Sequence, residues 1–116
     1  MSKNSPASSS TLLVVATSLP SVELAKTMAR AMVENYLAAC VQLTEGIQSI
    51  YRWEGKIFEE KEVLLSAKTT EAKWLEISTF IKNAHPYDLP EILAFSPEQY
   101  EKQYGKWVES EVNLKS

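Results

Sequence analysis

Residues 49–69 decide the fold, and they read Ser-Ile-Tyr-Arg-Trp-Glu-Gly-Lys-Ile-Phe-Glu-Glu-Lys-Glu-Val-Leu-Leu-Ser-Ala-Lys-Thr. β-Branched and aromatic residues run up to Glu54-Gly55, and a second such run leaves it. This pattern is typical of a β-hairpin with glycine at the turn position that needs positive φ. Because Glu-Gly forms a two-residue turn less readily than Asn-Gly, a longer loop with a glycine bulge is also open.

The second arm of this hairpin is too long for one helix to cover. Residues 56–69 contain no proline or glycine and would span about 46 Å at ~3.3 Å per residue. The helix expected at residues 71–84 covers only about 21 Å at ~1.5 Å per residue. The aromatic end of the hairpin therefore needs a partner or a sharp bend, and we expect another copy of the chain to supply the cover. The predicted subunit interface consists of Tyr51, Trp53, Ile57 and Phe58.

The chain before the hairpin predicts a strand, a helix and a second strand. Residues 11–17 form a short, continuous apolar run, which suits a strand that is buried on both faces. Ser21 can cap an amphipathic helix whose apolar residues recur at three- and four-residue steps and which ends near Leu37. Residues 39–53 then indicate one strand, interrupted at Glu45-Gly46 by a bulge or bend.

The chain after the hairpin predicts a helix, a short strand and a last helix. Apolar residues of the 71–84 segment share one face, and Pro86 ends that helix near Ala84. A stiff connector between two prolines leads into a brief strand at residues 92–95. Ser96-Pro-Glu-Gln99 combines an N-cap, proline at the first helical position and a capping-box glutamine, so the last helix is expected to begin there.

These elements follow the order β-α-β-β-α-β, with an appended C-terminal helix. The order predicts an α+β fold of the ferredoxin-like, split βαβ type, in which the helices lie on one face of an antiparallel sheet. The other face of that sheet also needs cover. The two uncovered surfaces together predict an oligomer.

Composition limits the classes to which the chain can belong. Its 116 residues suffice for one domain, expected at residues 11–116 after a Ser-rich, disordered tail at residues 1–10. The net charge of −3 argues against nucleic-acid binding, although the hairpin aromatics alone could stack on bases. No apolar run is long enough to cross a membrane, and we expect the Ser-rich tail, which has no apolar stretch, not to act as a signal peptide. The single cysteine, Cys40, excludes an internal disulfide and indicates the cytoplasm.

The sequence offers little material for catalysis. A nucleophilic site needs a serine or cysteine beside a histidine, and His85 is the one histidine of the chain. Cys40 lies in a predicted strand among small and apolar neighbours, where packing is the better interpretation. The three glycines form no phosphate-binding loop, and one cysteine with one histidine cannot build a structural zinc site. We therefore expect a protein that is not an enzyme.

Residues near the two-proline connector form the stronger candidate for a binding site. Glu62, Lys68, Tyr87 and Glu91 are expected to meet in a cleft between subunits, since ligands often bind at strand ends beside stiff loops. A structural salt bridge between Lys68 and Glu91 is an equally good interpretation. His85 is the candidate metal ligand, and the alternative is a connector role in which it hydrogen-bonds the backbone.

Three stretches of the chain stand in a distinctive order. They are Leu37-Ala-Ala-Cys-Val41, then Ser49-Ile-Tyr-Arg-Trp-Glu-Gly-Lys56 with Glu62 and Lys68-Thr69, and finally His85-Pro-Tyr-Asp-Leu-Pro-Glu-Ile92. Together they resemble the CutA family of divalent-cation tolerance proteins, over about residues 11–112. The resemblance implies a ferredoxin-like subunit in a compact homotrimer, with long hairpins wrapping neighbouring subunits. It also implies a non-enzymatic role in the response to divalent metal ions, copper among them.

The resemblance carries expectations about ligands as well. A cation site of the family would draw on Cys and His near the end of the first strand and just before His-Pro-Tyr, where this chain has Ala16, Thr17 and Ala84. Only His85 remains there as a soft ligand, so Cu²⁺ or another divalent cation is expected to bind weakly, and no cofactor is required.

A second function follows from the same resemblance. The family is similar in architecture to the PII trimers, which bind small effectors between subunits. The alternative is therefore a PII-like sensor that holds a small anionic or nucleotide-like ligand in the inter-subunit cleft. A scaffold whose trimer displays partner-binding surfaces is a third interpretation.

Overall fold

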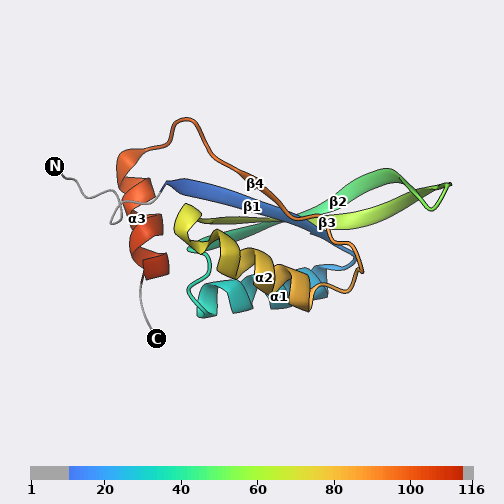
Figure 1. Cartoon of the computed structure of the whole chain (residues 1–116), viewed down its shortest axis with the longest axis horizontal. Coiled ribbons are helices and arrows are strands. Elements are labelled where there is room, and N and C mark those ends of the chain that lie inside the picture. Colours follow the sequence, from blue (N-terminus) through green and yellow to red (C-terminus); the bar gives the residue numbers. More distant parts are fainter. Residues whose placement is uncertain (1–10, 114–116) are drawn as a thin grey trace.

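The computed structural model describes residues 11–113, and these contain a four-stranded antiparallel sheet and three α-helices (Figure 1). In chain order the elements are β1 (Leu12–Leu19), α1 (Val22–Glu34), β2 (Cys40–Trp53), β3 (Lys56–Thr70), a short 3₁₀ helix (Glu71–Lys73), α2 (Trp74–Ala84), β4 (Leu93–Phe95) and α3 (Lys102–Asn113). The predicted order of elements is confirmed. The predicted tail at residues 1–10 lies outside the described residues.

Strand β1 lies inside the sheet, whose strand order is β2-β3-β1-β4. It pairs with β3 on one side and β4 on the other, so Val15 stands opposite both Ala67 and Ala94. Every residue of β1 except Val14 is buried. The continuous apolar run therefore forms a strand covered on both faces, as predicted.

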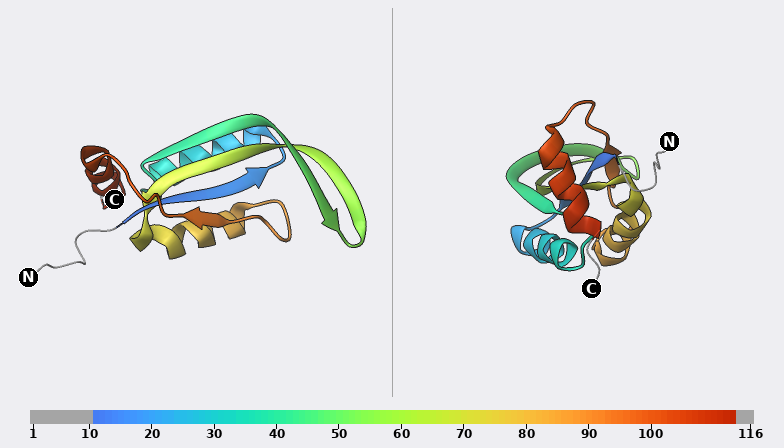
Figure 2. Two further views of the ribbon diagram at one scale, coloured as in Figure 1. Left: turned by 90° about the horizontal axis from the view of Figure 1, so that it is seen from above. Right: turned by 90° about the vertical axis from the view of Figure 1, so that its left-hand side faces the viewer.

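The hydrophobic core lies between helices α1 and α2 and the face of the sheet that both of them cover (Figures 1 and 2). The sheet contributes alternate residues of β1 and β3, and each helix contributes apolar residues at steps of three or four. The main members are Leu13, Val15, Leu19, Val63, Leu65 and Ala67 from the sheet, with Ala25, Met28, Met32, Ile77 and Ile81 from the helices.

Local capping explains where α1 begins and ends. The Oγ of Ser21 accepts a hydrogen bond from the backbone N–H of Leu24 at 3.2 Å, as the sequence predicted. The helix ends at Glu34 rather than near Leu37. It stops early because Tyr36 adopts a φ of 60°, the left-handed conformation that terminates many helices.

Helix α3 begins later than the sequence predicted. The expected start at Ser96-Pro-Glu-Gln99 is wrong, and the helix begins at Lys102. Its cap is Glu101, whose Oε1 accepts from the backbone N–H of Tyr104 at 2.8 Å. Ser96 directly follows β4, and the chain uses the next residues to pass from the sheet edge to the end of the sheet, across which α3 lies (Figure 1).

The face of the sheet away from α1 and α2 is only partly covered within one chain. Val108 and Val112 of α3 are fully buried at one end of the sheet. Leu93 and Phe95 of β4 are 47% and 55% exposed, and Phe95 shares the open face with its cross-strand partner Val14. The sheet therefore keeps exposed apolar surface on the side where the sequence predicted it.

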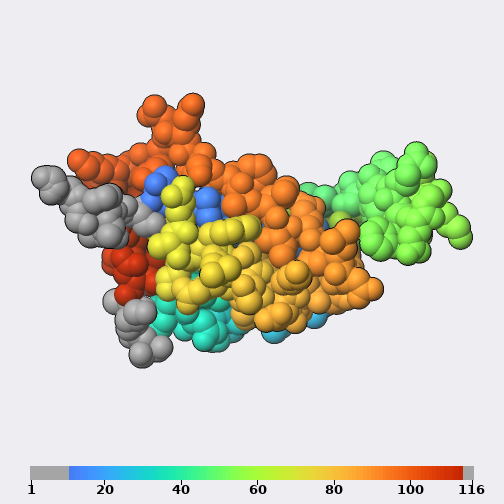
Figure 3. Space-filling view, viewed as in Figure 1, coloured from blue at the N-terminus to red at the C-terminus, as the bar shows by residue number. Residues whose placement is uncertain are grey.

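The hairpin of β2 and β3 extends well beyond both helices (Figures 1 and 2). Its end stands out from the body of the molecule in the space-filling view (Figure 3). The molecule measures 55 × 27 × 23 Å, so it is about twice as long as it is wide. None of residues 50–58 is buried within the chain. The prediction that the helices leave this end uncovered is confirmed.

The hairpin turn is the tighter of the two alternatives. Trp53 pairs directly with Lys56, so only Glu54 and Gly55 lie in the turn. Both have positive φ, 50° and 80°, which matches the twist of the two strands they join.

A β-bulge at Glu45-Gly46 changes the direction of the side chains along β2. These two residues stand opposite Val63 alone, and Gly46 has a φ of 77°, which glycine adopts without steric cost. Before the bulge, odd-numbered side chains of β2 point to the helices. After it they point to the other face, so Tyr51 lies on the same face as Glu62 of β3. The bulge thus decides which side chains the hairpin brings to the site described next.

Candidate functional site

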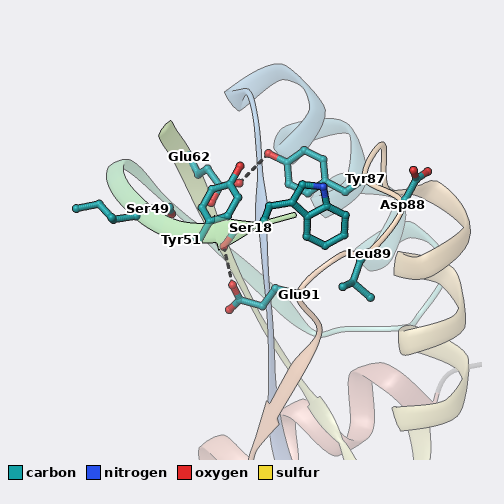
Figure 4. Close-up of a pocket in the computed structure, with 10 residues that line it drawn as sticks. Ser18, Ser49, Tyr51, Glu62, Tyr87, Asp88, Leu89 and Glu91 are labelled. Atoms are coloured by element: carbon teal, nitrogen blue, oxygen red, sulfur yellow. Dashed lines mark hydrogen bonds between the residues drawn. The ribbon is translucent and has the colours of Figure 1, made fainter. Parts of the chain in front are cut away.

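A cavity of about 570 Å³ lies where the hairpin meets the connector between α2 and β4 (Figure 4). This volume falls within the range of roughly 300–1,000 Å³ that is usual for small-molecule sites. Its walls come from the end of β1, the hairpin and the connector. The lining residues are Ser18, Ser49, Ile50, Tyr51, Trp53, Glu62, Tyr87, Asp88, Leu89 and Glu91.

A hydrogen bond between Tyr87 and Glu62 joins the connector to the hairpin. The Tyr87 hydroxyl donates to Oε2 of Glu62 at 2.7 Å, and Figure 4 shows it turned toward that carboxylate. Partial burial, this hydrogen bond and the negative charge of Glu62 together raise the pKa of Tyr87 above its ordinary value of 10.0. The phenol therefore stays protonated and holds one oxygen of Glu62 in place.

His85 fixes the start of the connector against the end of β1. It is 8% exposed, and its Nε2 lies 2.8 Å from the carbonyl oxygen of Ser18. The backbone N–H of Tyr87 donates to His85 Nδ1 at 3.2 Å. Because Nδ1 accepts, Nε2 must carry the proton and donate, so the imidazole is neutral in this arrangement. Both ring nitrogens are engaged in protein contacts, and a metal ion would have to displace one of them.

Glu91 and Asp88 differ in how they meet the cavity. The Ser18 hydroxyl donates to Oε1 of Glu91 at 3.3 Å, which is a long hydrogen bond. In Figure 4 the carboxylate of Glu91 is turned toward Ser18, whereas that of Asp88 points away from Glu62 and Tyr87. Glu62 and Glu91 are therefore the two carboxylates that face the interior.

Tyr51 connects the cavity to the end of the hairpin. Its hydroxyl donates to Oε1 of Glu60 at 2.7 Å, and that hydrogen bond raises the pKa of Tyr51. Its ring stacks on Phe58, with 5.6 Å between the ring centroids. Tyr51 and Trp53 were predicted as interface residues, and both line the cavity. Phe58 contacts the Tyr51 ring and is not among the residues that line the cavity. Ile57 lies beside the turn, with 63% of its surface exposed.

The structure brings together three of the four predicted cleft residues. Glu62, Tyr87 and Glu91 line the same cavity. Lys68 does not reach it within one chain, because it lies six residues along β3 from Glu62, roughly 20 Å away in extended backbone. Its Nζ donates to Oε1 of Gln42 at 2.5 Å, so Lys68 and Glu91 have different partners within the chain.

The remaining lining residues were missed because they depend on tertiary packing. Ser18 ends a buried strand and gives no polar pattern of its own. Ser49 reaches the cavity only because the bulge inverts the faces of β2. Asp88 and Leu89 lie in the connector between two prolines. The stiffness of that connector was the one sequence signal that could have pointed to them as cavity residues.

Residues 11–113 lack both a metal-binding cluster and a membrane-spanning helix. They contain no group of three or more His, Cys, Asp or Glu side chains arranged to hold a metal ion. No helix among them is long and apolar enough to span a bilayer. Cys40 is a free, half-buried thiol.

A family model described as the CutA1 divalent ion tolerance protein matches residues 13–111. A Divalent-cation tolerance protein CutA from Thermus thermophilus is 42% identical over 95 residues, which cover 82% of this chain and 92% of that protein. The human Protein CutA is 44% identical over 89 residues, covering 77% of this chain. The aligned part is half of the human protein.

Solved structures give the same result. The divalent cation tolerance protein of Thermus thermophilus superposes with a TM-score of 0.83 at 40% identity, covering 86% of this chain and 97% of that one. CutA1 from Oryza sativa gives a TM-score of 0.86 at 33% identity, covering 90% and 95%. A protein from Archaeoglobus fulgidus, described as the periplasmic divalent cation tolerance protein CutA, gives 0.85 at 32% identity, covering 88% and 99%.

Proposed function

The chain belongs to the CutA1 family of divalent ion tolerance proteins, which are not enzymes, and we propose that it acts as a homotrimer that binds divalent metal ions weakly. The observation that carries the functional assignment is the family match over residues 13–111, nearly all of the described chain. The trimer and the metal binding are further steps, and each is supported by a different part of the structure.

The exposed hairpin supports the trimer. Tyr51, Trp53 and Ile57 are 39%, 44% and 63% exposed within one chain, and Phe95 on the open sheet face is 55% exposed. Large apolar side chains gathered on two surfaces are typical of proteins that bury them in an assembly. A second copy of the chain, with its own hairpin, is a natural partner for both surfaces.

The surroundings of His85 support weak metal binding. Its two ring nitrogens already contact Ser18 and Tyr87, so Cu²⁺ can coordinate it only after one contact breaks. Titration calorimetry of the native protein with Cu²⁺ should give weak binding that His85→Ala abolishes, whereas Cys40→Ser should retain it. Equal Cu²⁺ affinity in the parent and in His85→Ala would exclude a metal site at His85.

Cytoplasmic location is part of the same proposal. The free thiol of Cys40 suits a reducing compartment, although one archaeal relative is described as periplasmic. Fractionation of cells that produce the native chain should recover it with cytoplasmic markers, and recovery with periplasmic or extracellular proteins would contradict this placement.

A second candidate function is the sensing of a small molecule. It is favoured by the cavity of about 570 Å³, which gathers Glu62, Tyr87 and Glu91 from distant parts of the chain. Native mass spectrometry of the purified assembly should detect a bound small molecule, in an amount that falls when Tyr87→Ala alters the cavity walls. A ligand-free assembly, purified without dialysis, would count against this function.

A further inference from the structure

Helix α3 carries aromatic side chains that its own chain leaves partly exposed. Tyr104 and Trp107 lie three residues apart, so they share one side of the helix, and their ring centroids are 5.7 Å apart. Tyr104 is 38% exposed and Trp107 is 44% exposed. The helix is anchored to the sheet by Val108 and Val112, which are fully buried. The two rings therefore present apolar surface beyond what that anchoring uses.

Tyr100 adds a third ring from the segment before the helix. A Cβ atom at position 105 would lie 2.4 Å from Cε1 of Tyr100, which is closer than real Cβ contacts, so the ring packs directly against the helix backbone at Gly105. Glycine weakens a helix relative to alanine, and here it gives up helix propensity for a packed ring. Tyr100 remains 44% exposed. Tyr100, Tyr104 and Trp107 together form the α3 aromatic face.

The hairpin end lies at the opposite end of the molecule from α3 (Figures 1 and 2). It bears Tyr51, Trp53 and Ile57, which are 39%, 44% and 63% exposed. Because the long axis of the molecule that separates them measures 55 Å, the two surfaces can meet only between different copies of the chain. A contact between two different surfaces repeats head to tail, and it closes into a ring when the rotation completes a turn. A cyclic trimer is such a ring.

The charges around the two surfaces have opposite signs. Residues 50–58 carry Arg52, Lys56 and Glu54, a net charge of +1. Residues 96–113, which include α3, carry four glutamates and two lysines, a net charge of −2. Opposite charges favour the approach of a hairpin end to α3, whereas like charges disfavour pairing of two hairpin ends or of two α3 helices.

We propose that the α3 aromatic face of one copy receives the hairpin end of the next copy, with Trp53 packed against Tyr104 and Trp107. This inference rests on the proposed homotrimer and names the two surfaces that meet in it. Packed aromatic side chains bury large areas and anchor many protein interfaces. One contact covers both exposed surfaces, because each copy gives its hairpin end to one neighbour and its α3 to the other.

A short bismaleimide cross-linker tests the contact directly. In a Cys40→Ser background, Lys56→Cys places a thiol opposite Trp53, its strand partner, and Gln103→Cys places one on α3, four residues before Trp107. The native assembly of the double variant should yield covalent species of up to three chain masses on a denaturing gel. Each single variant should stay at one chain mass, and linkage in either would show that like surfaces meet and would overturn the inference.

A matched pair controls for chance linkage. Lys56→Cys combined with Glu76→Cys should not cross-link, because Glu76 lies on α2 and its side chain is 63% exposed but away from the α3 aromatic face. Linkage of this pair as efficient as that of the Lys56→Cys, Gln103→Cys pair would also overturn the inference.

A double-mutant cycle asks whether Trp53 and Trp107 share one contact. Trp107→Ala should weaken the trimer at least about tenfold, measured by sedimentation velocity across a dilution series. Adding Trp53→Ala should weaken it less than about twofold further, since both substitutions remove the same contact. Trp74→Ala, at 38% exposure on α2, is the control and should leave the trimer unchanged. Fully additive losses from the two substitutions would overturn the pairing.

The outcomes separate this inference from the trimer on which it rests. If the parent chain sediments as a folded monomer, the proposed trimer is wrong and the contact is wrong with it. If the parent is a trimer but Lys56→Cys and Gln103→Cys do not link, the trimer stands and only the assignment of its surfaces is wrong.

Discussion

The two halves of the β2–β3 hairpin share one hydrogen-bonded ladder but have opposite surroundings. The proximal half, from Cys40 to Thr44 with its partner residues on β3, places Leu65 and Ala67 in the core beneath the helices. The distal half, beyond the bulge, has no buried residue between positions 50 and 58. Backbone pairing is therefore not what distinguishes them. The difference is that α1 and α2 do not extend over the distal half, so its side chains stay uncovered within one chain.

The bulge that separates the halves also separates their roles. It turns Tyr51 and Trp53 toward the face that bears Glu62, and so converts a stretch of alternating strand into one wall of a cavity. We expect the proximal half to stabilise the subunit and the distal half to offer surfaces for assembly and binding. Four substitutions test this division, and they are ordered by the size of the expected effect.

Trp53→Ala should have the largest effect, and it should act on the assembly. Removing a large aromatic side chain from a packed contact costs about 3–5 kcal/mol, here expected in trimer stability. Sedimentation velocity across a dilution series checks it. Trp74→Ala is the control, because Trp74 is similarly exposed at 38% but lies on α2, away from the hairpin. An unaltered trimer in the Trp53 variant would remove this residue from the interface.

Leu65→Ala should destabilise the subunit itself. Leu65 is fully buried in the core, so a cavity costs about 3 kcal/mol in the free energy of unfolding. Chemical denaturation measures this loss. Ile57→Ala in the distal half is the comparison. Ile57 is 63% exposed within one chain, so its loss should act on the assembly and depend on protein concentration, unlike that of Leu65→Ala. A concentration-independent loss of equal size in the two variants would erase the distinction between the halves.

Gly46→Val tests the boundary between the halves. No atom lies within 4 Å of a Cβ at this position, so the substitution meets no steric contact there. It meets only the backbone cost of a β-branched residue at a φ of 77°, about 2 kcal/mol in unfolding free energy. Gly46→Asn should cost less, since asparagine tolerates this conformation better. If valine and asparagine are equally harmless, the bulge does not depend on glycine.

Tyr87→Phe should have the smallest effect, about 1 kcal/mol, because it removes one hydrogen bond to Glu62. The raised pKa of Tyr87 adds a pH dependence. Above about pH 10.0 the unfolded chain loses this proton while the folded chain keeps it, so the contribution of Tyr87 to stability falls as pH rises. Unfolding free energies of the parent and the variant, measured from pH 8 to pH 11, should therefore converge at the alkaline end. A constant difference would contradict the bond to Glu62.

Much of the fold could be predicted because local signals agreed with tertiary packing. The run at residues 11–17 became a strand buried on both faces, Ser21 became a helix cap, and Glu54-Gly55 became the turn. In each case the pattern depends only on neighbouring residues. The prediction of where α3 begins was wrong because here the local signal disagreed with the tertiary structure. Ser96 has a good capping pattern, but it directly follows strand β4 and the helix begins only at Lys102.

The site was less predictable than the fold. The sequence identified Glu62, Tyr87 and Glu91, whose charges and stiff connector are visible locally. It placed Lys68 with them as a further charged residue at a strand end, in a cleft between subunits. Within one chain Lys68 lies six residues along β3 from Glu62, too far to share the cavity. Ser18 entered the site through the packing of the connector on β1, which no local pattern encodes.

The central claim is that the distal half of the hairpin is covered by other copies of the same chain. Sedimentation velocity of the purified native protein at micromolar concentration tests it most directly. The expected result is a single species of three chain masses. A well-folded monomer at that concentration would contradict the claim.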